Sequence, residues 1–106
     1  MNKISINLPM DQIKKLCIKW KIKELSLFGS ILRDDFDFEK SDIDILYVFM
    51  PGVHWGLDIV EMKEELEKLF TRSIDLVSKR AIEQSKNPYR KEEILNSYKV
   101  IYDQAA

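Results

Sequence analysis

The chain has 106 residues, of which 45% are hydrophobic and 33% are charged, as is typical of a soluble folded protein. Its 17 basic and 18 acidic residues leave a net charge of −1, so no overall positive charge draws it to nucleic acid or to a membrane. We expect a single domain over residues 1–106, located in the cytoplasm. The size suits one core, and neither a signal peptide nor an apolar run of about 20 residues is visible.

Apolar spacing predicts a helix, a strand and a second short helix in the first third of the chain. Residues 10–20 carry apolar side chains at helical spacing after Pro9, which is tolerated in a first helical turn. Cys17 falls within this apolar stripe, and we expect it to be a buried core thiol. Residues 22–28 are expected to form a strand that stops at Gly29, followed by a short helix from Ser30.

The rest of the chain continues this alternation. Residues 43–50 are the most apolar run and predict a central strand that is covered on both faces. We expect a helix from Trp55 to Leu69, a strand over 73–77, and a last helix after Pro88 whose stripe includes Ile94, Tyr98, Ile101 and Tyr102. The predicted fold class is therefore α/β (α+β), with a mixed sheet of three or more strands flanked by helices.

Three aspartates lie on or beside predicted strands. Asp42 and Asp44 are two residues apart, so on one strand they point to the same face with Cα atoms about 6.5 Å apart. Asp75 lies in the later strand. Such carboxylates repel each other unless a cation joins them, and oxygen ligands favour magnesium or manganese. If the strands are neighbours, we expect Asp42, Asp44 and Asp75 to form a metal-binding catalytic site for phosphoryl or nucleotidyl transfer.

Gly29 and Ser30 can provide the partner site for phosphate. Glycine lets another group approach the backbone closely, and N–H groups at the start of a helix attract anions. Arg33, about one turn later, can reach the same anion through two hydrogen bonds. Magnesium is commonly bound by one or two carboxylates together with substrate phosphates. We therefore expect Gly29, Ser30 and Arg33 to bind the phosphates of a nucleotide.

The motif GSILRDDFDFEKSDIDIL, followed by SIDLV and the tail NPYRKEEILNSYKVIYD, resembles the minimal nucleotidyltransferases of the DNA polymerase β superfamily. The likeness is closest to the MNT-domain antitoxins that are encoded beside HEPN-domain ribonuclease toxins. It extends from the first helix to Tyr102. The sequence departs from the family at one point. Eleven residues separate Ser30 from Asp42, one more than is typical of the family, and the additional residue falls in the expected loop over 34–40.

This resemblance implies the nucleotidyltransferase fold, with Mg²⁺ as cofactor and ATP as co-substrate. It implies transfer of AMP to a hydroxyl of a partner HEPN toxin, such as that of a tyrosine, which silences the toxin. Asp42 and Asp44 would be metal ligands, and Asp75 would be the third catalytic carboxylate. Gly29 and Ser30 would contact the nucleotide phosphates, with Arg33 assisting.

Two other readings stay open. The chain could be a non-catalytic antitoxin that neutralises its partner by complex formation, although buried acids are costly to keep without a cation. It could also be a relative that keeps the fold and has lost turnover. Direct nucleic-acid binding is not expected, because no basic stripe is interleaved with aromatic residues. The sequence does not determine the acceptor residue, the preferred nucleotide, the number of metal ions or the oligomeric state.

Overall fold

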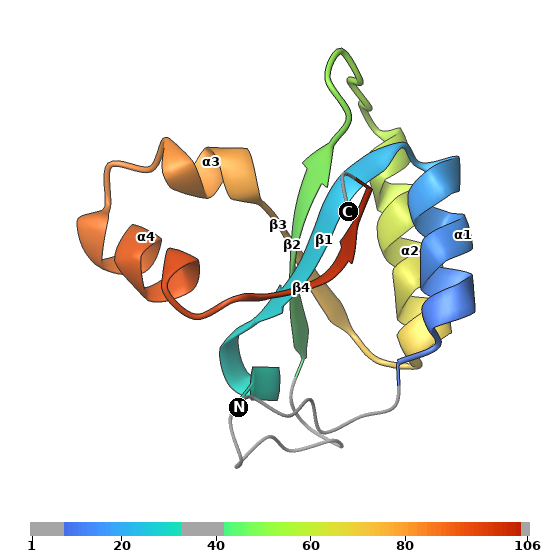
Figure 1. The fold of residues 1–106 in the computed structure, drawn as a ribbon, viewed down its shortest axis with the longest axis horizontal. Coiled ribbons are helices and arrows are strands. Elements are labelled where there is room, and N and C mark those ends of the chain that lie inside the picture. Colours follow the sequence, from blue (N-terminus) through green and yellow to red (C-terminus); the bar gives the residue numbers. More distant parts are fainter. Residues whose placement is uncertain (1–7, 33–41, 105–106) are drawn as a thin grey trace.

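The computed structural model describes residues 8–32 and 42–104 (Figure 1). In chain order, the elements are α1 (Met10–Lys19), β1 (Ile22–Phe28), the 3₁₀ helix η1 (Gly29–Leu32), β2 (Ile43–Phe49), α2 (Asp58–Phe70), β3 (Ile74–Ser78), α3 (Lys79–Glu83), α4 (Pro88–Leu95) and β4 (Lys99–Asp103). Over these residues the strands form a four-stranded sheet in the order β3-β2-β1-β4. β1 is antiparallel to β2 and β4, whereas β2 and β3 are parallel. The predicted mixed sheet flanked by helices is confirmed.

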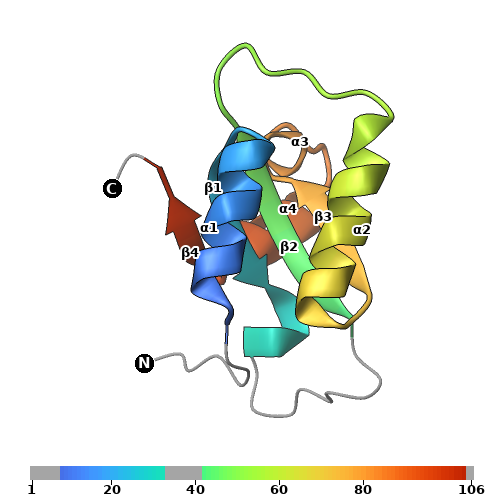
Figure 2. The same ribbon diagram turned by 90° about the vertical axis from the view of Figure 1, so that its right-hand side faces the viewer.

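α1 and α2 cover one face of the sheet, where they lie side by side (Figure 2). Their apolar stripes meet the inward-facing strand residues in the main hydrophobic core, which comprises Ile13, Leu16, Cys17, Trp20, Ile22, Leu25, Leu27, Ile31, Ile43, Ile45, Met62, Leu66, Phe70 and Ile74. β2 lies between β1 and β3, so the prediction of a central strand over 43–50 is confirmed. Cys17 is fully buried as predicted, and this burial raises the pKa of its thiol to about 12.

The opposite face of the sheet is covered by α3 and α4, which extend outward from it (Figure 1). A smaller apolar cluster of Phe28, Leu46, Ile82 and Ile94 joins them to β1 and β2. We call residues 79–95, which include both helices, the α3–α4 arm. In the described parts of the chain, no helix is long and apolar enough to cross a membrane.

The last predicted helix is wrong in its second half. α4 ends at Leu95, and residues 99–103 instead form β4, whose Tyr102 and Val100 are register partners of Leu25 and Ser26 in β1. The segment KVIYD contains β-branched and aromatic residues that favour a strand, and it covers an edge of β1 that would otherwise be unpaired. The helical spacing in this segment is therefore a coincidence, because Ile94 lies in α4 whereas Ile101 and Tyr102 lie in β4.

The predicted start of the second long helix is also wrong. α2 begins at Asp58, and Trp55 lies in the loop before it. Its indole Nε1–H donates to the backbone carbonyl of Trp20 at 2.9 Å, and the two rings meet edge to face with centroids 5.1 Å apart. Trp55 thus packs against the core as expected, but from the loop that joins β2 to α2 rather than from a helical stripe.

Candidate functional site

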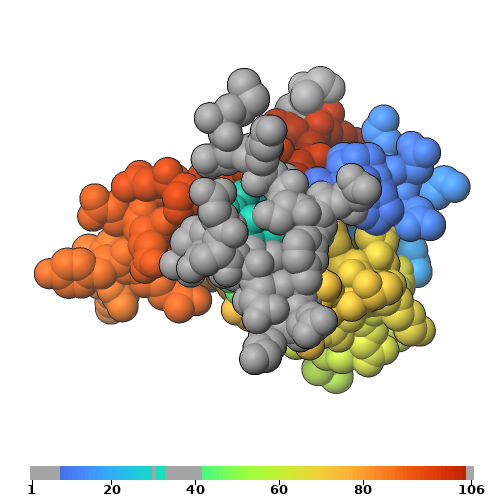
Figure 3. Space-filling model, turned by 90° about the horizontal axis from the view of Figure 1, so that it is seen from below, coloured from blue at the N-terminus to red at the C-terminus, as the bar shows by residue number. Residues whose placement is uncertain are grey.

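The end of β1 and the starts of β2 and β3 meet at one end of the sheet. β1 runs antiparallel to β2, and β2 runs parallel to β3, so these three points coincide in space. Phe28 is the register partner of Asp44, and Asp44 is the register partner of Asp75. Figure 3 shows this end of the molecule, with η1 near its centre and the α3–α4 arm extending to one side. The strands that carry the predicted acids are therefore neighbours, as the site requires.

Asp44 and Asp75 share one face of the sheet. Side chains in register on adjacent strands point the same way, and adjacent strands lie about 4.8 Å apart. Asp44 is partly buried, whereas Asp75 is exposed. Asp42 is exposed and directly precedes β2, where the N–H of Ile43 donates to the carbonyl of Ser73 at 3.0 Å. This hydrogen bond fixes the start of β2 against the start of β3, so Asp42 also lies at this end of the sheet.

The carboxylates of Asp42, Asp44 and Asp75 are not arranged as a complete set of metal ligands in this structure. Over residues 8–32 and 42–104, no group of three or more histidine, cysteine, aspartate or glutamate side chains is placed to hold a metal ion. Asp42 and Asp75 are exposed, and carboxylates of like charge repel each other unless a cation joins them. The structure therefore aligns Asp44 with Asp75 through the backbone, and the metal site itself stays a prediction.

Gly29 packs directly against Asp44. Its φ of +77° lies in the left-handed region that residues with a Cβ rarely adopt. A Cβ at this position would overlap Oδ2 of Asp44 and lie 3.3 Å from its Cγ. The glycine is thus needed for two reasons, its backbone conformation and the carboxylate that occupies the space beside it. This contact joins the Gly-Ser turn to the Asp-x-Asp strand.

The other two predicted phosphate contacts are not tested by the geometry. The backbone of Ser30 lies in η1, which confirms a short helical turn after Gly29. Arg33 lies outside the described residues. The roles of Gly29, Ser30 and Arg33 toward phosphate therefore stay predictions.

A polar cluster on the same face of the sheet was not predicted. The ammonium of Lys79 lies 2.8 Å from a carboxylate oxygen of Glu24, 2.9 Å from the hydroxyl of Tyr98 and 4.4 Å from the centroid of the Tyr98 ring. Burial opposes the charge on Lys79, but hydrogen bonds to Glu24 and Tyr98 outweigh it, so the pKa of Lys79 is raised above its ordinary value. The cluster ties the α3–α4 arm to β1. A glutamate inside a strand, where it is depleted, was the available signal.

The sequence matches the nucleotidyltransferase domain family over residues 10–101. Two relatives from Methanocaldococcus jannaschii, both named as candidate protein adenylyltransferases, are 42% identical over 76 residues and 36% identical over 93 residues. The first alignment covers 72% of each chain, and the second covers 88% of this chain and 94% of the relative.

Solved structures share the same fold. A candidate minimal nucleotidyltransferase superposes with a TM-score of 0.63 at 29% identity, over 88% of this chain and 87% of that one. A chain of a toxin–antitoxin crystal structure with AMP-PNP gives a TM-score of 0.67 at 22% identity, over 92% and 75% of the two chains. A complex of a tri-AMPylated Shewanella oneidensis HEPN toxin with its MNT antitoxin gives 0.59 at 21%, over 91% and 71%. The last two likenesses concern the fold alone.

The family match runs from α1 through all three acid-bearing positions and into β4, and the register of β1, β2 and β3 brings the family's Gly-Ser turn and aspartates to one end of the sheet. This chain therefore belongs to the nucleotidyltransferase domain family, and it is a nucleotidyltransferase of the minimal kind that its sequence resembles.

Proposed function

We propose that this protein transfers AMP from magnesium-bound ATP to a hydroxyl of a protein partner, specifically a tyrosine of a HEPN-type toxin, and thereby acts as a cytoplasmic antitoxin. The observation that carries this proposal is the alignment of Asp44 with Asp75 across β2 and β3, beside Gly29, whose positive φ and close contact with Asp44 disfavour any side chain. In-line nucleotidyl transfer uses carboxylates that hold metal ions close to the substrate phosphates, and the aspartates and the Gly29–Ser30 turn would supply these groups at this end of the sheet.

The donor set fits a hard divalent cation. Asp42, Asp44 and Asp75 offer carboxylate oxygens, which suit magnesium better than the nitrogen or sulfur ligands that zinc prefers. Asp42 and Asp44 would hold the ion together with the triphosphate. When bound, magnesium supplies positive charge that offsets the charge on the phosphate oxygens.

The remaining roles fall to the chain's own residues. Asp75 is exposed at the mouth of the site, where it can accept the proton of an incoming hydroxyl. The backbone of η1 would face the phosphates beside Asp44, and the Ser30 hydroxyl and Arg33 would add hydrogen bonds to them. These groups would orient the α-phosphorus toward the acceptor oxygen.

The similar proteins favour a macromolecular acceptor. The names of the relatives support a protein acceptor, because both are candidate protein adenylyltransferases. The fold neighbours support a toxin as that acceptor, because they come from toxin–antitoxin complexes, one with an AMPylated HEPN toxin.

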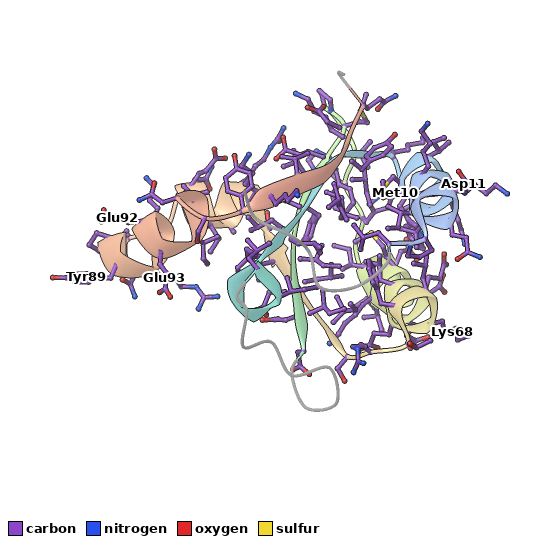
Figure 4. All side chains as sticks on the ribbon, turned by 60° about the horizontal axis from the view of Figure 1, so that its bottom comes forward. Met10, Asp11, Lys68, Tyr89, Glu92 and Glu93 are labelled. Atoms are coloured by element: carbon purple, nitrogen blue, oxygen red, sulfur yellow. The ribbon has the colours of Figure 1, made fainter. Side chains whose placement is uncertain are left out.

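The test is to incubate the protein with α-labelled ATP, magnesium and the product of the adjacent gene. We expect label on that protein with the wild type and none with Asp44→Asn. Asp11→Asn is the matched control, because Asp11 is an exposed acid on α1, away from the site (Figure 4). If Asp44→Asn still neutralises the toxin fully, complex formation rather than AMP transfer is the function.

A further inference from the structure

We propose that Tyr89 is itself an acceptor, and that one copy of this chain adenylylates Tyr89 of another copy. The inference rests on the proposed function, because it uses the same transfer of AMP to a phenolic hydroxyl. It adds a modification site on the enzyme's own surface.

The other three tyrosines of the chain are held by the fold. Tyr47 is half-buried, with its ring 4.9 Å from that of Phe49, and Tyr102 packs against the main core; burial raises the pKa of both. The hydroxyl of Tyr98 accepts a hydrogen bond from Lys79. Each of these hydroxyls would have to leave its packing to enter another molecule's site.

Tyr89 differs in every one of these respects. Its side chain is 84% exposed and makes no hydrogen bond in the described structure. It lies in the first turn of α4, where the Asn87 side chain accepts hydrogen bonds from the N–H groups of Tyr89 and Arg90 at 3.1 and 3.2 Å. The backbone that carries the ring is therefore ordered, so presenting the hydroxyl requires no unfolding of the arm.

The position of Tyr89 requires transfer between two molecules. Figure 4 shows its side chain at the outer end of the α3–α4 arm, pointing away from the sheet that carries Asp44 and Asp75. The arm extends beyond the body of the molecule (Figure 3), so its tip can contact a second copy. The same chain's own site is out of reach without detaching the arm, which the Lys79 cluster holds to β1.

The reaction balances with ATP as the co-reactant. The phenolic oxygen of Tyr89 attacks the α-phosphorus, a new P–O bond forms, and the bond from the α-phosphorus to the bridging oxygen of the β-phosphate breaks. Pyrophosphate leaves, and the phenolic proton passes to Asp75 of the donor copy and then to water. The product is a phosphodiester of AMP with tyrosine.

The experiment is incubation of the purified protein with α-labelled ATP and magnesium, followed by tandem mass spectrometry of its peptides. We expect AMP on Tyr89 in the wild type, loss of label in Tyr89→Phe, and unchanged label in Tyr102→Phe, whose hydroxyl is removed from a packed ring. Tyr89→Phe removes only a solvent-exposed oxygen, so it leaves the fold intact. A mixture of Asp44→Asn as acceptor with Tyr89→Phe as donor should label the Asp44→Asn chain, although neither variant labels alone.

Label that persists in Tyr89→Phe, or a mixture that stays unlabelled, overturns the inference. The proposed function is tested separately by giving Tyr89→Phe a high concentration of N-acetyltyrosinamide and measuring its AMP ester. Formation of the ester with no label on wild-type Tyr89 refutes the inference and leaves the proposed function standing. If neither the ester nor labelled Tyr89 forms, both fail.

Discussion

The contact between Gly29 and Asp44 gives a sharp prediction for Gly29→Ala. The left-handed backbone alone costs a residue with a Cβ about 1 kcal/mol. The new methyl group would also overlap Oδ2 of Asp44, so the carboxylate must leave its preferred rotamer at a further cost of about 1 kcal/mol. We therefore expect the free energy of unfolding to fall by about 2 kcal/mol.

The effect on activity should be larger than the effect on stability. A methyl group at Gly29 displaces a predicted metal ligand from its position, and misplacement by about 1 Å can reduce a rate by about 100-fold. Stability is measured by urea denaturation, and activity by the rate of AMP transfer with ATP in excess.

The chain contains its own matched control. Gly52 also has a positive φ, of +82°, but a Cβ there would meet nothing within 4 Å. Gly52→Ala should therefore cost about 1 kcal/mol through the backbone and leave AMP transfer unchanged. In an Asp44→Ala background the nearest remaining atom of residue 44 would be its Cβ at 3.6 Å, an ordinary contact, so Gly29→Ala should then cost only as much as Gly52→Ala. Equal effects of Gly29→Ala and Gly52→Ala in the wild-type background would refute this account of the motif.

Two further predictions concern groups that the fold buries. Burial raises the pKa of the Cys17 thiol to about 12 from an ordinary 9.0. Below pH 9 the thiol is neutral in both the folded and the unfolded chain, so its contribution to stability is complete there. Between about pH 9 and pH 12 the unfolded chain loses that proton first, and stability should fall by about 1.4 kcal/mol per pH unit; denaturation curves of Cys17→Ala should lack this component. Lys79→Met leaves Glu24 partly buried without its cation, and we expect a loss of about 2 kcal/mol in thermal or urea unfolding. Lys86→Met, at an exposed position on the same arm, should change stability by less than about 0.5 kcal/mol.

The spacing of apolar residues correctly predicted the elements that each contribute an apolar face to the core. α1, β1, β2 and β3 came out near their predicted bounds, because each has an apolar stripe or run that one core requires. The prediction of one last helix after Pro88 was wrong because two short elements, α4 and β4, together show the apolar spacing of a single helix. What makes residues 99–103 a strand is the free edge of β1, some 75 positions earlier in the chain, and no local pattern contains that information.

The sequence could predict the position of the aspartates in the candidate site, but not the polar cluster on the same face of the sheet. Alternation alone places Asp42 and Asp44 on one face, and strand pairing then adds Asp75 in register. The Glu24–Lys79–Tyr98 cluster could not be predicted, because its three members come from β1, the start of α3 and the turn before β4. Their contact depends on how the arm folds back over the sheet, which sequence spacing does not determine.

The structure adds a second role for the glycine of the Gly-Ser turn. Its contact with phosphate stays a prediction, and the carboxylate of Asp44 occupies the space that a Cβ at Gly29 would need. The turn and the acids are therefore one packed unit, and the pairing of Phe28 with Asp44 between β1 and β2 sets their positions. The pairing of Phe28 with Asp44 does not involve the connection between Ser30 and Asp42, so we expect the one additional residue there to leave this pairing unchanged. Changing the length of this connection should therefore alter the contact between Gly29 and Asp44 much less than adding a single methyl group at Gly29 does.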